Sequence, residues 1–115
     1  NRKLMKVENT KAQMRKGILE YCILTILSNK EAYPSEIIKE LKEAKLIVVE
    51  GTLYPLLTRL KNASLLQYKW VESPSGPPRK YYSLMEEGKI FLKELKQTWT
   101  ELHEAVQLIS NSHQK

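Results

Sequence analysis

The chain has 115 residues, of which 42% are hydrophobic and 28% are charged, and its formal net charge is +6. This length and composition predict one domain with one core, and they exclude two catalytic lobes and a wholly disordered chain. No apolar run approaches the roughly 18 residues that span a bilayer, and the basic start is not followed by the uninterrupted apolar core of a secretory signal. We therefore expect a cytoplasmic protein with no membrane partner.

The positive charge is concentrated in two segments. Residues 1–16 carry six basic side chains against Glu8 alone, a net charge of +5, and residues 50–82 carry five against Glu50 and Glu72, a net charge of +3. The rest of the chain has no positive excess. An anionic partner is therefore expected at these two places and not over the whole surface.

The first helix is predicted over residues 14–28. Its apolar residues are too dense for a one-sided helix, so we expect it to be buried nearly all round, with Asn29 and Lys30 at its end. Cys22 lies within it and is the one cysteine of the chain, which excludes an intrachain disulfide. We interpret it as a small buried core residue and not as a reactive thiol.

A second and a third helix are predicted next. The second opens at Tyr33-Pro34-Ser35, where Pro34 or Ser35 suits the first turn or the cap, and its buried stripe is Ile37, Ile38, Leu41 and Ala44. Residues 46–49 favour an extended connector or a short strand, because they are β-branched and apolar. Gly51 then permits a sharp turn into a helix over residues 52–63, with Pro55 tolerated in its first turn.

A β-hairpin is predicted after the third helix. Residues 66–72 and 79–85 are rich in aromatic and branched side chains, and residues 73–78 between them, with three prolines, have the composition of a turn. The last helix is predicted from Glu86 to about Ser110. The fold class is therefore mainly α with a small β-hairpin.

The last helix carries the clearest periodic pattern in the chain. Apolar residues alternate at spacings of three and four, which is typical of a coiled-coil seam. The helix would be roughly 37 Å long, well beyond the radius of about 13 Å expected for a compact chain of this size. We therefore expect it to project and to pair in a homodimer through Leu92, Leu95, Trp99, Leu102, Val106 and Ile109.

Three helices followed by a hairpin is the order of a winged helix-turn-helix, in which the third helix enters a DNA groove and the hairpin contacts the backbone. Two motifs specify it further, EGTLYPLL at residues 50–57 and GPPRKYY at residues 76–82. Both closely resemble those of the PadR family of transcriptional regulators, over roughly residues 15–109. The resemblance implies a dimeric DNA-binding repressor, with residues 1–85 as the N-terminal helix and DNA-binding domain and residues 86–115 as the dimerisation helix and a frayed tail.

The chain departs from the family pattern at three places. Residues 33–35 are Tyr-Pro-Ser where the family more often has Tyr-Gly-Tyr, so a backbone contact of the family is in doubt there. Ser64 stands where a glycine commonly ends the recognition helix, and Met85 stands where a threonine usually caps the last one. Because Met85 cannot cap, we expect Ser83 and Glu86 to form a capping box that starts this helix earlier.

The third helix has one core face and one outward face. Leu53, Leu56, Leu57 and Leu60 gather on the core side, and Gly51, Pro55, Thr58 and Asn62 lie opposite. The outward side chains are small and include no arginine that could read a guanine. Phosphate contacts should therefore outnumber base contacts, with Thr58 and Asn62 as the base-reading candidates. The predicted DNA-binding residues, on the second helix, the third helix and the hairpin, are Ser35, Thr52, Tyr54, Thr58, Arg59, Lys61, Asn62, Arg79 and Lys80.

Three roles are left open by the sequence. Tyr54 could instead pack under the hairpin, and Arg79 and Lys80 could be ordinary solvated charges. The basic segment 1–16 either touches DNA, extends the first helix against the dimer partner, or only aids solubility.

Trp99 is the candidate for an effector site. A two-fold axis across the seam would bring Trp99 of both subunits together, and two indoles could hold a planar ligand between them. A tryptophan here resembles the multidrug-responsive PadR members, which implies a planar aromatic or phenolic small molecule as effector. The competing interpretation is that Trp99 is a bulky packing residue of the seam.

The sequence offers no parts for other chemistry. There is no aspartate, no second cysteine, and the two histidines are ten residues apart, so neither a metal site nor a catalytic triad is expected. We expect no cofactor and no enzymatic activity. The alternative function is a winged helix that binds another protein and no nucleic acid, which a basic hairpin disfavours.

Overall fold

The computed structural model describes residues 2–114. The elements in chain order are α1 (Arg2–Asn29), α2 (Pro34–Glu43), α3 (Glu50–Asn62), β1 (Leu66–Ser73), β2 (Gly76–Leu84) and α4 (Glu86–Ser112). The two strands form an antiparallel hairpin. The predicted fold class, mainly α with a small hairpin and a long C-terminal helix, is confirmed.

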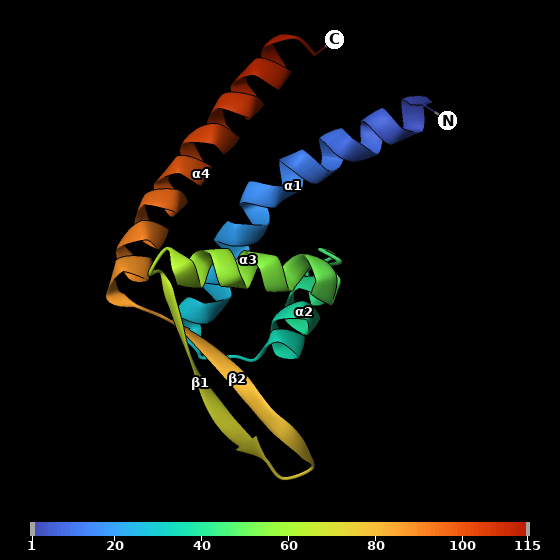
Figure 1. Cartoon of the computed structure of the whole chain (residues 1–115). Coiled ribbons are helices and arrows are strands. Elements are labelled where there is room, and N and C mark those ends of the chain that lie inside the picture. Colours follow the sequence, from blue (N-terminus) through green and yellow to red (C-terminus); the bar gives the residue numbers. More distant parts are fainter. Residues whose placement is uncertain (1, 115) are drawn as a thin grey trace.

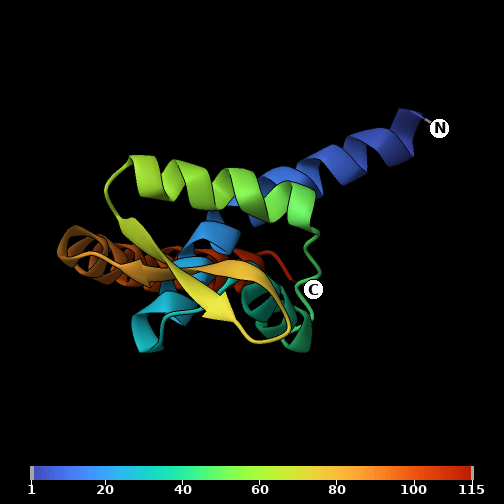
Figure 2. The ribbon, with the colours of Figure 1, turned by 60° about the horizontal axis from the view of Figure 1, so that its bottom comes forward.

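The core lies where α1, α2 and α3 meet the root of the hairpin. Ile23 and Leu24 of α1, Ile37 of α2 and Leu53 and Leu57 of α3 are fully buried there. These residues recur at helical spacing, so each helix turns one apolar side inward. In Figure 1, α3 crosses α1, and the hairpin, which Figure 2 shows from below, extends from the same region.

Helix α1 is longer than predicted and only partly buried. It begins at Arg2 and not at Met14, and residues 6–17 are exposed, whereas the predicted enclosure holds between Leu19 and Leu27. Lysine, methionine, glutamate and glutamine are good helix formers, so the polar half continues the helix without burying a face. The described residues of the basic segment extend the helix; contact of this segment with a dimer partner or with DNA stays a prediction. Asn1 lies outside the described residues.

Helix α2 begins as expected, with Pro34 in its first turn, and buries Ile37 and Leu41. The prediction that Ala44 is buried is wrong, because Ala44 is the exposed C-terminal cap of the helix. The connector at residues 46–49 is not a strand but an irregular segment. Cys22 packs against the core as predicted, but it is half-buried and not buried. Burial raises the pKa of its thiol, which makes it less reactive than a free cysteine.

Helix α4 packs its first turns on the core and then leaves it. Leu92 and Leu95 are partly buried against the core, whereas Leu102, Val106 and Ile109 are exposed. In Figure 1, α1 and α4 both extend past α3, to the end of the molecule opposite the hairpin tip. The radius of gyration of 16.7 Å exceeds the roughly 13 Å of a compact chain of this length.

Helix α4 begins at Glu86 with Met85 as its cap, and no side chain caps it. The predicted capping box of Ser83 and Glu86 is therefore wrong. Ser83 is still in strand β2, where it pairs with Gln67. The extended backbone of the strand continues to Met85, so the helix cannot start earlier.

Candidate nucleic-acid interface

The first turn of α2 forms one edge of the candidate site. Tyr33 precedes the helix in an extended conformation, and its backbone N–H donates to Glu36 Oε1 at 3.2 Å. Pro34 takes the first helical position, where its missing N–H leaves no gap in the hydrogen-bond ladder. This start leaves Ser35 exposed in the first turn of the helix.

Helix α3 forms the second edge. The Val49 carbonyl accepts from the N–H groups of Thr52 and Leu53, at 3.0 and 3.1 Å, so the helix starts at Glu50, two residues before its predicted start. Pro55 consequently lies inside the helix and not in its first turn, which corrects the prediction. A proline there leaves the carbonyl four residues earlier without a donor. That carbonyl belongs to Gly51, an exposed residue whose carbonyl water can solvate.

The hairpin forms the third edge. Its turn is two residues long, Pro74 and Ser75, because Ser73 pairs with Gly76. The predicted six-residue loop is therefore wrong, and Pro77 and Pro78 lie within strand β2. The ribbon tolerates them because the register shifts opposite them, between Val71 and Ser73, and neither proline has a paired residue there that would need its N–H.

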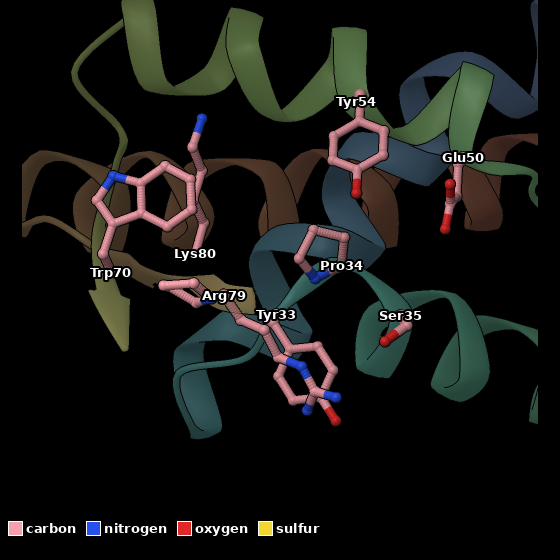
Figure 3. Close-up of a pocket in the computed structure, with 9 residues that line it drawn as sticks. Tyr33, Pro34, Ser35, Glu50, Tyr54, Trp70, Arg79 and Lys80 are labelled. Carbon is pink, nitrogen blue, oxygen red and sulfur yellow. The ribbon is translucent and has the colours of Figure 1, made fainter. Parts of the chain in front are cut away.

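These three edges enclose an open cleft of about 310 Å³. Figure 3 shows Tyr54 of α3 and Trp70 of β1 on either side of the hollow, with Lys80 beside the indole and Ser35 at the start of α2. Among the lining residues that the structure describes, the acidic one is Glu50. The residues that line the cleft are Tyr33, Pro34, Ser35, Glu50, Tyr54, Trp70, Pro78, Arg79 and Lys80.

Aromatic rings hold the basic side chains of this cleft. The guanidinium carbon of Arg79 lies 4.3 Å from the ring centroid of Tyr33, which packs edge-on against Tyr81. The Lys80 ammonium lies 4.5 Å from the ring of Tyr68, and the Lys61 ammonium lies 5.7 Å from the same ring. Cation–π contacts of this kind restrain a cation without neutralising it. The cleft is therefore a positively charged surface with its charges held in place.

Tyr82 lies beneath these aromatic and basic side chains and is 4% exposed. Burial raises the pKa of its hydroxyl, and the neighbouring phenols of Tyr68 and Tyr54 raise it further. Its backbone exchanges hydrogen bonds of 2.8 and 3.1 Å with Ala32. Tyr82 is thus a neutral anchor that joins the hairpin to the segment before α2.

The chain resembles proteins of one family in sequence and in structure. Residues 23–94 match the model of the transcriptional regulator PadR-like family. A solved PadR-like transcription factor from Bacteroides fragilis is 64% identical, with a TM-score of 0.76 over 88% of this chain and 98% of that one. A PadR-like transcriptional regulator from Bacillus cereus is 40% identical, with a TM-score of 0.74 over 84% and 95%. A PadR family regulator from Eggerthella lenta is 32% identical, with a TM-score of 0.80 over 90% of each chain.

The chain belongs to the PadR-like family of transcriptional regulators. Members of this family are DNA-binding transcriptional regulators and not enzymes. In the described residues there is no cluster of three potential metal ligands, and no helix is long and apolar enough to cross a membrane.

The three departures from the PadR pattern can each be located in the structure. Ser64, which replaces the usual glycine, has a φ of 64°, in the left-handed region that glycine adopts without strain. Ser35, within the altered Tyr-Pro-Ser segment, still lines the cleft. The third departure, Met85, leaves α4 without a side-chain cap.

The structure divides the DNA-binding residues predicted on α3 between two sides of the helix. Tyr54 lines the cleft, Lys61 contacts the ring of Tyr68 on the hairpin, and Thr58 and Asn62 are exposed on the outward face. Tyr54 lines the cleft and is 45% exposed. It is therefore not buried under the hairpin and stays a candidate for DNA contact.

Thr52 and Arg59 lie on the opposite shoulder of α3, toward α1. Arg59 forms an ion pair with Glu20 of α1, whose side chain is 14% exposed, and lines a hollow next to Phe91 of α4. Thr52 lines a second hollow with Arg15 of α1. The structure thus does not bring these two residues to the cleft, and the charge of Arg59 is paired; their contact with DNA stays a prediction.

Trp99 is 40% exposed on α4, and its ring lies 5.6 Å from that of His103. The exposed seam residues on the same helix, Leu102, Val106 and Ile109, have no cover within the described chain.

Sequence reasoning missed Tyr33 and Trp70, which both line the cleft. Trp70 pairs with Lys80, a residue that the sequence had already singled out. This pairing could not be counted from the turn, because the register shifts by one residue between Val71 and Ser73.

Proposed function

We propose that this PadR-like chain is a repressor that binds an inverted-repeat operator as a homodimer. The outward face of α3 enters the major groove, and the hairpin lies on the sugar–phosphate backbone. The observation that carries this proposal is the cleft, in which the start of α2, one side of α3 and the basic end of β2 face the same hollow.

Most of the contacts in this arrangement are to phosphates. Arg79 and Lys80 are exposed or half-buried and lack an acidic partner among the described residues, so both can bind phosphate oxygens. Ser35, Tyr54 and Lys61 extend the same positively charged path. Thr58 and Asn62 are the base-reading side chains, and with so few of them operator choice also depends on DNA shape.

Alanine substitution in the hairpin tests this assignment. Arg79→Ala and Lys80→Ala should each weaken operator and non-operator duplexes nearly alike, and each should lower the slope of log affinity against log salt by about 1. Lys69→Ala is the matched control, because Lys69 lies in the same hairpin but pairs with Glu31 at 3.3 Å outside the cleft. A changed base preference with the slope intact would contradict the phosphate role. Failure of the unsubstituted protein to shift any duplex at low salt would favour the alternative of a protein-binding winged helix.

The homodimer forms through α4 and α1. Leu102, Val106 and Ile109 are each more than half exposed, and a stripe of this kind on a projecting helix requires a cover. A second copy provides one, because a two-fold axis brings the same stripe to both sides of the seam. Residues 86–115 are thus the dimerisation segment, which the exposed half of α1 assists, and residues 1–85 contain the DNA-binding part.

Two recognition helices related by a two-fold axis require two half-sites. The half-sites should lie about one helical turn, roughly 34 Å, apart on one face of the duplex. Sedimentation of the protein with a duplex that carries such a repeat should show two chains per duplex.

We propose further that Trp99 lines an effector site at the dimer centre, for a planar aromatic or phenolic molecule. Its indole is partly exposed, and the ring of His103 lies 5.6 Å from it. Trp70→Phe leaves Trp99 as the one tryptophan. Planar cationic dyes and phenolic acids should quench it saturably and, in the unsubstituted protein, weaken operator binding through the same linkage. Quenching without a change in DNA affinity would leave Trp99 as a packing residue.

A further inference from the structure

Trp70 is the most exposed tryptophan of the chain, although it lies on the face of the hairpin that enters the core. Successive residues of a strand point to opposite faces, so Leu66, Tyr68 and Trp70 share one face. Burial decreases along this face, from Leu66 at 1% exposed through the half-buried Tyr68 to Trp70 at 62%. The core therefore ends at Tyr68, and packing within the chain does not account for the indole beyond it.

Neighbouring side chains hold this indole in place. Trp70 pairs with Lys80 across the hairpin, and the Lys80 ammonium lies 5.3 Å from the indole ring. Tyr68 packs edge-on against the indole, with ring centroids 6.3 Å apart. A large apolar surface that is already oriented loses little conformational entropy on binding.

The indole and the ammonium face the same cleft. Figure 3 shows Trp70 and Lys80 side by side on the hairpin, across the hollow from Tyr54. Cationic and aromatic groups alternate here. The ammonium of Lys61, on α3, lies over the ring of Tyr68, and the ammonium of Lys80 lies over the rings of both Tyr68 and Trp70. The ligand that fits such a row has negative charges spaced by flat or apolar groups. A DNA strand has this character, because phosphates alternate with deoxyribose rings.

We propose that Trp70 is a DNA-contacting residue, whose indole packs against a deoxyribose next to the phosphate that Lys80 binds. This inference rests on the proposed function and adds to it an uncharged contact. Deoxyribose is the same at every base pair, so the contact adds affinity and no sequence preference. The indole displaces no counterion, so it adds nothing to the salt dependence.

These properties give Trp70 a signature that differs from that of its neighbour. Trp70→Ala should weaken operator and non-operator duplexes alike by about 10-fold or more, on the scale of aromatic contacts to nucleic acids. The salt slope should stay at its original value. Lys80→Ala should instead lower the slope by about 1. Trp70→Phe should retain part of the affinity, because a phenyl ring preserves a flat apolar face.

The test measures duplex binding by fluorescence anisotropy over a series of salt concentrations, with a labelled random-sequence duplex and an operator duplex obtained by selection. Ile47→Ala is the control, because Ile47 is 77% exposed but lies on the connector before α3, outside the cleft. Tryptophan emission of the unsubstituted protein and of Trp70→Phe is recorded with and without saturating DNA. Emission that DNA quenches in the unsubstituted protein, and not in Trp70→Phe, reports contact at Trp70.

The expected result is a loss of affinity in Trp70→Ala at an unchanged salt slope, with quenching that disappears in Trp70→Phe. Circular dichroism establishes that each variant is folded. If Trp70→Ala binds as tightly as Ile47→Ala and DNA leaves the Trp70 emission unchanged, the inference is wrong while the proposed function stands. If the unsubstituted protein binds no duplex at low salt, the proposed function fails first.

Discussion

Gly88→Ala should destabilise the protein, because Gly88 is where α4 crosses the segment between α3 and the hairpin. A methyl group at Gly88 would overlap the Leu65 carbonyl oxygen and would lie 3.1 Å from its carbon and 3.2 Å from Leu84 Cδ2. Backbone cannot rotate away as a flexible side chain can, so helix and loop must separate by about 1 Å to restore ordinary contact. The same carbonyl accepts the Met85 N–H at 3.0 Å, so the movement also weakens the hydrogen bond that anchors α4.

The magnitude follows from three effects. Overpacking in a buried place costs about 1–3 kcal/mol, and the weakened hydrogen bond adds about 1 kcal/mol. Replacing glycine in a helix returns at most about 1 kcal/mol. The net expectation is a loss of about 2 kcal/mol, which lowers the melting temperature by about 8 °C in a chain of this length.

Thermal and urea unfolding of Gly88→Ala measure this loss at one fixed protein concentration, because a dimer's stability depends on concentration. Gly51→Ala is the matched control, since it also lies in a helix and a methyl group there meets nothing within 4 Å; it should change stability only through helix propensity, a gain of at most about 1 kcal/mol. A Gly88→Ala variant that melts at or above the temperature of the unsubstituted protein would refute the reasoning.

Three further predictions concern other parts of the molecule. Ser64→Gly should raise the unfolding free energy by about 0.5–1 kcal/mol in urea melts, because it relieves a left-handed backbone conformation; no gain would mean that Ser64 is not strained. Leu102→Asp should place a charge in the dimer seam and yield monomers or unfolded protein in sedimentation, whereas an unchanged dimer would exclude Leu102 from the seam. The raised pKa values of Cys22 and Tyr82 mean that the folded protein keeps protons which the unfolded chain releases, so stability should be full below about pH 9 and fall as the pH rises further. Urea melts between pH 8 and pH 11 should show a smaller fall for Cys22→Ala, and an equal fall would assign the effect elsewhere.

The sequence predicted the helices that bury a face, because apolar periodicity records burial. The leucines of α3 are an example, since the structure places Leu53 and Leu57 in the core as expected. The polar half of α1 escaped prediction since it buries nothing. The starts of α3 and of strand β2 were predicted wrongly for another reason. Pro55 was placed in the first turn of its helix and Pro77 in the turn of the hairpin, whereas both lie inside regular elements.

The candidate site was predictable to the level of elements and not to the level of side-chain direction. A helical projection of α3 separates the side that carries Tyr54 and Lys61 from the side that carries Thr52 and Arg59. It does not tell which side faces α1 and which faces the hairpin. Arg59 was therefore assigned to DNA although Glu20, distant in sequence, pairs with it. The role of Gly88 was equally invisible, because it depends on the carbonyl of Leu65 on another segment.

The central claim is that two copies of this chain present α3 and the hairpin to an inverted repeat in DNA. The most direct measurement is to incubate the purified protein with a pool of random-sequence duplexes, to separate the retained fraction and to sequence it. The account predicts enrichment of an inverted repeat whose half-sites are about one helical turn apart. Retention of no duplex at low salt, or enrichment of a single unrepeated half-site, would contradict it.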